Sequence, residues 1–154
     1  MTNVFVYGSL ISDDVVSALL SRVPPSHPAI LPNYHRFSIK ERVYPAIIPV
    51  ENNKVVGKVL IGITPPELYI FDTFEDAEYE RKTVDVFLID SSEKLQVETY
   101  VWQNKTDPNL YGEWDFEALT INSLVAIIKY GDALTSVHES KPEDKSDVEW
   151  NFEH

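Results

Sequence analysis

The chain of 154 residues is 44% hydrophobic and 12% aromatic, which is typical of one packed domain rather than of a disordered chain. Its formal net charge of −12 argues against binding to a nucleic acid backbone, and the absence of cysteine excludes thiolate nucleophiles, disulfides and zinc sites with cysteine ligands. No segment has the length of a membrane span and the polar start does not resemble a signal peptide, so we expect a cytoplasmic protein without a membrane partner.

The first predicted strand is the apolar run Val4-Phe5-Val6, and Tyr7-Gly8-Ser9-Leu10 follows it directly. We interpret the tetrapeptide as a tight turn at the end of a buried strand, because glycine adopts backbone angles that other residues avoid. Such a turn lets a ligand approach the main chain closely, and its outward-pointing amides can hold an anion or a developing oxyanion. The four residues alone fit a purely structural turn at least equally well.

The next segment contains one short helix and several extended stretches. The helix is predicted over Asp13–Arg22 with Ser12 as its N-cap, and the pair Pro24-Pro25 ends it. Extended stretches are predicted at Ile30–Ile39, Ala46–Val50 and Val55–Ile63. The polar residues Glu51–Lys54 predict a turn, and the stretch that follows them is apolar on both faces, as in a central strand.

A second helix is predicted to begin at Thr64-Pro65-Pro66-Glu67, which combines a threonine N-cap, an early proline and a capping-box glutamate. It runs to about Glu75. In a projection at about 100° per residue, Glu75 falls inside the apolar arc, between Leu68 and Phe71. Apolar surroundings and a helix C-terminus both raise the pKa of a carboxylate, which is how a glutamate comes to exchange protons near neutral pH.

Two structural explanations of Glu75 are kept beside the functional one. In the first, the helix has frayed before it reaches Glu75. In the second, a buried salt bridge with Arg81 satisfies the carboxylate. Asp72 and Asp76 project toward the polar side of the same helix, so Glu75 is the acid that we expect to face the interior.

The second half of the chain is predicted to hold an antiparallel pair of strands and a last helix. The strands are Thr83–Ile89 and Leu95–Trp102, and the helix runs from about Trp114 to Tyr130, where Gly131 stops it. We therefore predict one domain over residues 1–131 and an acidic, flexible tail over 132–154. Consecutive strand pairs favour an α+β fold, a small mixed or antiparallel β-barrel flanked by helices, over a doubly wound parallel sheet.

Several kinds of chemistry have no support in the sequence. The four histidines show no metal-ligand spacing, so no metal site is predicted. Ser9 lacks the flanking glycines of a nucleophile elbow, which disfavours a serine hydrolase built on Ser9 and His35. Neither a Walker loop nor a G-x-G-x-x-G motif is present, so no nucleotide cofactor is predicted.

Two motifs in this order, Tyr7-Gly8-Ser9-Leu10 and the segment Phe71–Arg81, resemble the gamma-glutamylcyclotransferase superfamily. Within it, the chain is most similar to the plant branch named for avirulence-induced genes. An arm from Asn33–Arg36 to Tyr44–Ile47 and the glycine-containing strand Val55–Val59 match the family as well. The resemblance extends from about Val4 to Trp102.

The resemblance implies a small mixed β-barrel flanked by helices, with a cavity at its mouth. It also implies a cofactor-free acyl transfer in which the α-amine of a γ-glutamyl substrate attacks its own γ-carbonyl, giving 5-oxoproline and a free amine or amino acid. Glu75 would be the general base and then the general acid. The residues implied to hold the γ-glutamyl group or to position Glu75 are Tyr7, Gly8, Ser9, Leu10, Tyr79 and Arg81.

The chain departs from the family pattern after the candidate glutamate, where Asp76 replaces the usual glycine. A second carboxylate there would raise the pKa of Glu75 further, or the altered backbone would weaken activity. The alternative function is therefore a non-catalytic small-molecule binding module that keeps the fold. A third interpretation is an interaction protein that binds through Trp150 and Phe152 of the tail. The sequence identifies neither the leaving group nor any protein partner.

Overall fold

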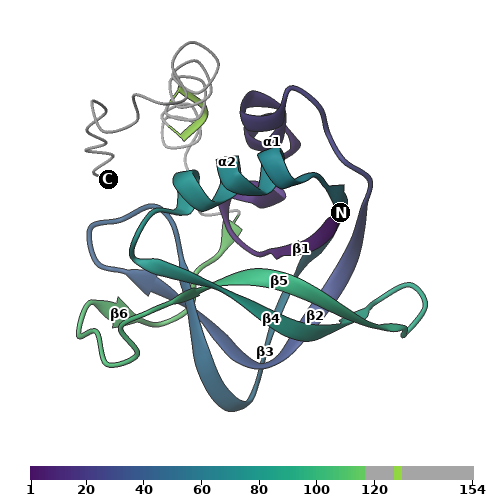
Figure 1. Ribbon diagram of the computed structural model, residues 1–154. Coiled ribbons are helices and arrows are strands. Elements are labelled where there is room, and N and C mark those ends of the chain that lie inside the picture. The colour runs from purple at the N-terminus through teal and green to yellow at the C-terminus, as the bar shows by residue number, and fades with distance from the viewer. Residues whose placement is uncertain (117–126, 130–154) are drawn as a thin grey trace.

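The structure is a computed structural model that describes residues 1–116 and 127–129 (Figure 1). Among these residues, strands in the order β3-β1-β5-β4-β2 close into a barrel, because β2 also pairs with β3. The barrel strands are β1 (Thr2–Val6), β2 (Ser26–Ile39), β3 (Ala46–Ile63), β4 (Tyr79–Leu88) and β5 (Lys94–Trp102). A short strand, β6 (Leu110–Tyr111), is added to β2. The β1–β5 pairing is parallel and the others are antiparallel, so the predicted α+β mixed barrel is confirmed.

The predicted turn at Glu51–Lys54 is wrong, because β3 continues through these residues. These polar residues lie instead at an irregularity in the pairing of β2 with β3. Asn33 and Asn52 both have a positive φ, of 62° and 67°, and the Asn52 N–H donates to Asn33 Oδ1 at 3.1 Å. The register shifts at this point, as at a β-bulge. Backbone pairing also lengthens two other strands beyond their apolar runs, so that β2 begins at Ser26 and β4 at Tyr79.

The helices begin where their capping residues predict. A single 3-10 turn, η1 (Ser9–Ile11), precedes α1 (Asp13–Leu20), whose N-cap Ser12 accepts from the Val15 N–H. This helix ends two residues earlier than predicted, at the left-handed Ser21. The second helix, α2 (Pro65–Glu75), has the full capping box predicted from its sequence. In Figure 1, α1 and α2 lie on the same side of the barrel.

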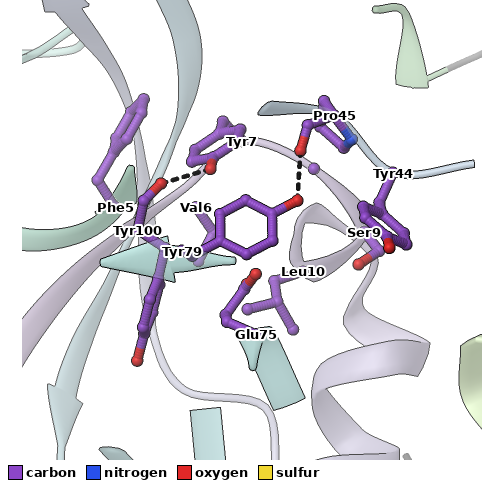
Figure 2. Close-up of a pocket in the computed structure, with 11 residues that line it drawn as sticks. Phe5, Val6, Tyr7, Ser9, Leu10, Tyr44, Pro45, Glu75, Tyr79 and Tyr100 are labelled. Carbon is purple, nitrogen blue, oxygen red and sulfur yellow. Dashed lines mark hydrogen bonds between the residues drawn. The ribbon is translucent and has the colours of Figure 1, made fainter. Parts of the chain in front are cut away.

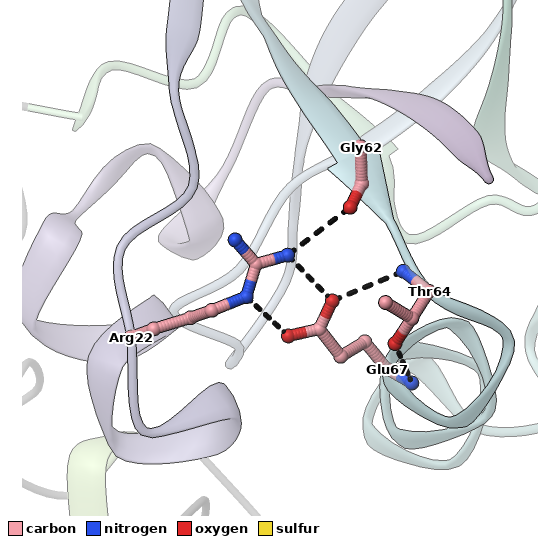
Figure 3. A network of polar contacts seen from close by, with 4 residues as sticks. All are labelled: Arg22, Gly62, Thr64 and Glu67. Carbon is pink, nitrogen blue, oxygen red and sulfur yellow. Dashed lines mark hydrogen bonds and ion pairs between the residues drawn. The ribbon is translucent and has the colours of Figure 1, made fainter.

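Arg22 ties the end of α1 to the start of α2 (Figure 3). Its Nε and Nη2 donate to the two carboxylate oxygens of Glu67 at 2.6 and 2.7 Å, and Nη2 also donates to the Gly62 carbonyl at 3.1 Å. Glu67 Oε1 accepts the Thr64 N–H at 3.0 Å within the capping box. A bidentate pair of this kind fixes direction as well as distance, so the first turn of α2 is anchored against α1 and β3.

β1 is buried on both of its faces, which explains the continuous apolar run with which the chain begins. Val4 and Val6 pack with the helices, where Phe71 of α2 is fully buried, whereas Phe5 and Tyr7 point into the barrel. The strand therefore lies between two hydrophobic clusters. Its end, where the tetrapeptide turn begins, is held from both sides.

The predicted last helix is only partly within the described residues. Trp114 and Asp115 are not helical, whereas residues 127–129 are. The rest of that helix, its stop at Gly131 and the predicted tail over 132–154 lie outside the described residues. No helix in the described part of the chain is long and apolar enough to cross a membrane.

Candidate active site

A small pocket lies between the turn that follows β1 and the C-terminal end of α2 (Figure 2). The turn contributes one wall, and the loop before β3, the start of β4 and the end of β5 contribute the others. The residues that line it are Phe5, Val6, Tyr7, Gly8, Ser9, Leu10, Tyr44, Pro45, Glu75, Tyr79 and Tyr100. The fold thus brings the tetrapeptide and Glu75 into one cavity.

The turn that lines this pocket has backbone donors that the described part of the fold does not use. Its carbonyls are used by η1, since the Ile11 N–H donates to Gly8 O at 3.0 Å and the Ser12 N–H to Ser9 O at 3.1 Å. The N–H groups of Gly8, Ser9 and Leu10 donate to no oxygen of the described residues. Unsatisfied amides at the start of a helical turn are suited to holding an anion or an oxyanion.

Gly8 is required by close packing and not by a left-handed backbone. Its φ of −125° lies outside the left-handed region, and a Cβ at this position would lie 2.9 Å from Cγ and Cδ of Pro45. The close approach of Pro45 is therefore a steric reason for glycine that the sequence did not indicate. Pro45 closes over the turn, and only a residue without a side chain leaves room for it.

Arg36 holds the turn from outside the pocket, a role that was not predicted. Its Nη1 donates to the Tyr7 carbonyl at 2.8 Å and to the Val56 carbonyl at 3.0 Å, and the guanidinium lies 5.6 Å from the Trp114 ring centroid. The arginine therefore joins the turn to β3. Nothing in the local sequence around Arg36 distinguishes it from a surface arginine of a strand, because both carbonyls belong to distant segments.

Glu75 is the last residue of α2, and its side chain points into the pocket between Tyr79 and Leu10 (Figure 2). No hydrogen bond or ion pair joins its carboxylate to another described residue. Burial raises the pKa of Glu75 to about 8, and the nearby Asp72 adds to this shift. The helix reaches Glu75, so the prediction of an inward-facing carboxylate is confirmed and the frayed-helix alternative is wrong.

The salt bridge predicted as an alternative partner for Glu75 is also wrong. Arg81 does not line the pocket: its guanidinium lies 3.0 Å from Asp72 Oδ2 and 3.5 Å from Glu98 Oε1. Asp72 also accepts a hydrogen bond from the Tyr100 hydroxyl at 2.6 Å. The carboxylate that perturbs Glu75 is thus Asp72, one helical turn earlier, and not the adjacent Asp76, which is exposed.

Tyrosines form much of the pocket wall. The Tyr7 hydroxyl donates to the Tyr100 carbonyl at 2.5 Å, and the Tyr79 hydroxyl donates to the Pro45 carbonyl at 2.6 Å. Burial raises the pKa of both tyrosines well above the usual value, so both stay protonated and their protons stay engaged. Their oxygens can still accept hydrogen bonds from a ligand. The sequence analysis did not predict three of the lining residues, Tyr44, Pro45 and Tyr100. In a sequence, a tyrosine that lines a pocket cannot be distinguished from a tyrosine of the core.

Asp76 adopts backbone angles that are usual for glycine. Its φ of 66° and ψ of −171° lie in a region that is almost restricted to glycine. The Asp76 carboxylate accepts the Ala77 N–H at 2.7 Å, which compensates for part of the strain. The substitution therefore changes the backbone energy beside Glu75 rather than the electrostatics of the pocket.

We expect Asp76→Gly to raise the free energy of unfolding by about 1 kcal/mol, because glycine adopts these angles without steric strain. In a chain of this size the change corresponds to a melting temperature higher by roughly 2–4 °C, measured by thermal unfolding. Asp76→Ala is the matched control, since it removes the carboxylate but keeps the Cβ. Equal stability of the glycine and alanine variants would show that the backbone is not strained.

Comparisons with known proteins agree with this architecture. Residues 4–116 match the family described as gamma-glutamyl cyclotransferase, AIG2-like. Over 118 residues the chain is 64% identical to AIG2-like protein D of Arabidopsis thaliana, an alignment that covers 76% of this chain and 78% of that protein. A solution structure from Arabidopsis thaliana is similar with a TM-score of 0.69 and 43% identity, over 90% of this chain and 91% of the other. A yeast gamma-glutamyl cyclotransferase specific to glutathione shares the fold at 14% identity, with a TM-score of 0.52 over 94% of this chain and 90% of its own.

Proposed function

The chain belongs to the AIG2-like gamma-glutamyl cyclotransferase family, and from this premise we propose that it converts a γ-glutamyl amine or peptide into 5-oxoproline and a free amine or amino acid. The observation that carries the proposal is that Glu75 and the turn line one pocket, and that neither the Glu75 carboxylate nor the turn amides hydrogen-bond to another described residue. The first group can move a proton and the second can stabilise an oxyanion. The proposed reaction uses no cofactor.

The pocket offers donors and acceptors on different walls, which orients a γ-glutamyl group. Its α-ammonium would face the Glu75 carboxylate and the phenol oxygens of Tyr7 and Tyr79. The γ-carbonyl oxygen would face the amides of the turn, where Gly8 and Ser9 supply donors. An approaching ammonium also favours the charged form of Glu75, so binding itself prepares the base.

The reaction then needs two proton movements around one ring closure. Glu75 takes a proton from the α-ammonium, and the resulting amine attacks the γ-carbonyl carbon to form a carbon–nitrogen bond and an oxyanion. As this intermediate collapses, the bond to the leaving nitrogen breaks and Glu75 returns its proton to that nitrogen. The ring nitrogen loses its second proton, and the released amine carries it away as an ammonium ion.

The cavity would contribute by holding the substrate folded. Attack is already intramolecular in a γ-glutamyl compound, so what the cavity adds is the near-attack orientation that the flexible free substrate rarely adopts. General acid–base catalysis adds roughly 10²–10⁴-fold. A single tuned carboxylate and a turn of amides are sufficient for this chemistry.

The test is a panel of γ-glutamyl amines and γ-glutamyl dipeptides, incubated with the full chain and assayed for 5-oxoproline. We expect turnover of at least one class, with the amine or amino acid released in equal amount. Turnover of amines but not dipeptides, or the reverse, would identify the leaving group.

The alternative is a non-catalytic module that binds a small molecule in the same pocket, and the strained Asp76 beside Glu75 is the observation that favours it. Thermal stabilisation by 5-oxoproline without turnover of any panel member would support the binding module. That outcome would refute the proposed enzyme while leaving the pocket as the binding site.

A further inference from the structure

Asp72 attaches the end of α2 to the barrel. Its carboxylate accepts from the Tyr100 hydroxyl of β5 at 2.6 Å and lies 3.0 Å from Arg81 Nη1 of β4. Arg81 Nε also lies 3.5 Å from Glu98 Oε1, and the Glu98 carboxylate accepts a short hydrogen bond from the Thr83 hydroxyl. The last turn of α2 is therefore held by side chains of two neighbouring strands.

Tyr100 connects this attachment to the turn on the other side of the pocket. Its hydroxyl donates to Asp72, and its backbone carbonyl accepts the hydroxyl of Tyr7. Glu75 lies one turn after Asp72 on the same helix, and Tyr7 lies at the start of the amide turn. Through Tyr100, Asp72 therefore links the position of the proposed base to that of the proposed oxyanion site.

Asp72 also dominates the charges that act on Glu75. Among the described residues, the titratable groups that share this region with Glu75 are Asp72 on its own helix, Tyr7 after β1, Tyr44 before β3, Tyr79 on β4 and Tyr100 on β5. Tyr7, Tyr79 and Tyr100 are neutral, since burial raises the pKa of each of these three tyrosines. Among the described residues, Asp72 is therefore the anion that disfavours the charged form of Glu75, and Arg81 partly offsets it.

We propose, on the premise of the function above, that Asp72 is a positioning residue that fixes Glu75 in the pocket through its contacts with Tyr100 and Arg81. Its negative charge, one helical turn from Glu75, also favours the protonated form of that carboxyl. Arg81 acts through Asp72 by partly neutralising its charge. The two side chains therefore have opposite effects on Glu75, although they form one ion pair. The family resemblance implied that Arg81 positions Glu75 or lines the pocket; it does not line the pocket, and it would position Glu75 only through Asp72.

The experiment follows the titration of Glu75 directly, by carbon NMR of protein labelled at the glutamate carboxyl carbons, with the Glu75→Gln variant to assign the signal. We expect Asp72→Asn to lower the titration midpoint of Glu75 by roughly 0.5–1 pH unit, because a like charge is lost while Tyr100 keeps an acceptor. We expect Arg81→Gln to raise it. Asp76→Asn is the matched control, because it removes an exposed charge next to Glu75 and should leave the midpoint unchanged.

The Glu75 titration midpoint should shift in opposite directions in Asp72→Asn and Arg81→Gln. General damage to the fold would instead move it in the same direction in both variants. An unchanged midpoint in Asp72→Asn, or equal shifts in that variant and Asp76→Asn, would overturn the proposal. If Asp72→Asn does not fold, a midpoint in Arg81→Gln that is unchanged or lowered overturns it.

The titration needs no substrate. A wild-type chain without turnover would therefore refute only the proposed function, and the effect of Asp72 on Glu75 could still be measured. With turnover, the acidic limb of the kcat/KM profile should move with the NMR midpoint in each variant.

Discussion

The Glu75→Gln variant is expected to lose 5-oxoproline release by roughly 10²–10⁴-fold while keeping its fold, because it cannot accept the α-ammonium proton. Glutamine has nearly the same size as glutamate, and the carboxylate that it replaces makes no hydrogen bond or ion pair with the described residues. Its removal therefore breaks no such interaction there. The measurement is kcat/KM for whichever panel substrate the wild type turns over, together with a thermal unfolding curve.

Glu80→Gln is the matched control for this loss. Glu80 is exposed on β4, and its carboxylate lies 3.6 Å from Lys82 Nζ in a surface ion pair. Such pairs contribute little to stability, so we expect wild-type activity and stability. A Glu75→Gln activity within a few-fold of wild type would remove Glu75 from the proposed mechanism.

The pH dependence of stability gives an independent check on the same variant. The pKa of Glu75 is about 8 in the folded chain against a usual value of 4.5, so between these values the folded state binds more protons than the unfolded state. The contribution of Glu75 to the free energy of unfolding of the wild type therefore falls as pH rises through this window. Glutamine has no such dependence. The melting temperature of the variant should accordingly rise relative to wild type between about pH 5 and about pH 8.

The part of the site that could be predicted is the part that local signals determine. The capping box at Thr64 and Glu67 sets both the start and the phase of α2, and the phase decides which face Glu75 occupies. Likewise, the apolar run of β1 followed by Gly8 indicates where a buried strand ends. Each inference needs only a few neighbouring residues.

The remainder could not be predicted, because it depends on contacts between distant segments. Arg81 is equally compatible with Glu75 and Asp72 in sequence, and only the positions of β4 and β5 relative to α2 decide between them. The residues around Asn52 have the composition of a turn, but their pairing with β2 keeps the chain extended there. Pro45 reaches the pocket through the loop between two long strands, whose length no local pattern determines.

The two walls of the pocket are therefore positioned in different ways. The Glu75 wall is a helix end tied to β4 and β5 through side chains, chiefly Asp72. The amide wall is the continuation of β1, which is held by backbone pairing with β3 and by Arg36. Substitutions at the first wall are expected to change proton affinity, whereas substitutions beneath the second should change geometry.

Gly57 of β3 provides the sharpest test of the amide wall. A Cβ at this position would lie 2.3 Å from the Val6 carbonyl oxygen and 2.9 Å from the Phe5 ring. The oxygen belongs to the backbone, so it cannot move without moving the end of β1. We expect Gly57→Ala to lower the free energy of unfolding by about 1–3 kcal/mol, as for other overpacked sites, measured by urea unfolding.

The same substitution should reduce activity beyond its effect on stability, because Val6 directly precedes the turn. Relieving the contact requires the end of β1 to move by about 1 Å, and a misplacement of that size costs roughly 10²-fold in rate. Val56→Ala is the matched control on the neighbouring residue: its side chain is exposed, and its carbonyl still accepts from Arg36. If folded Gly57→Ala had the kcat/KM of that control, the backbone of β1 would not position the oxyanion donors.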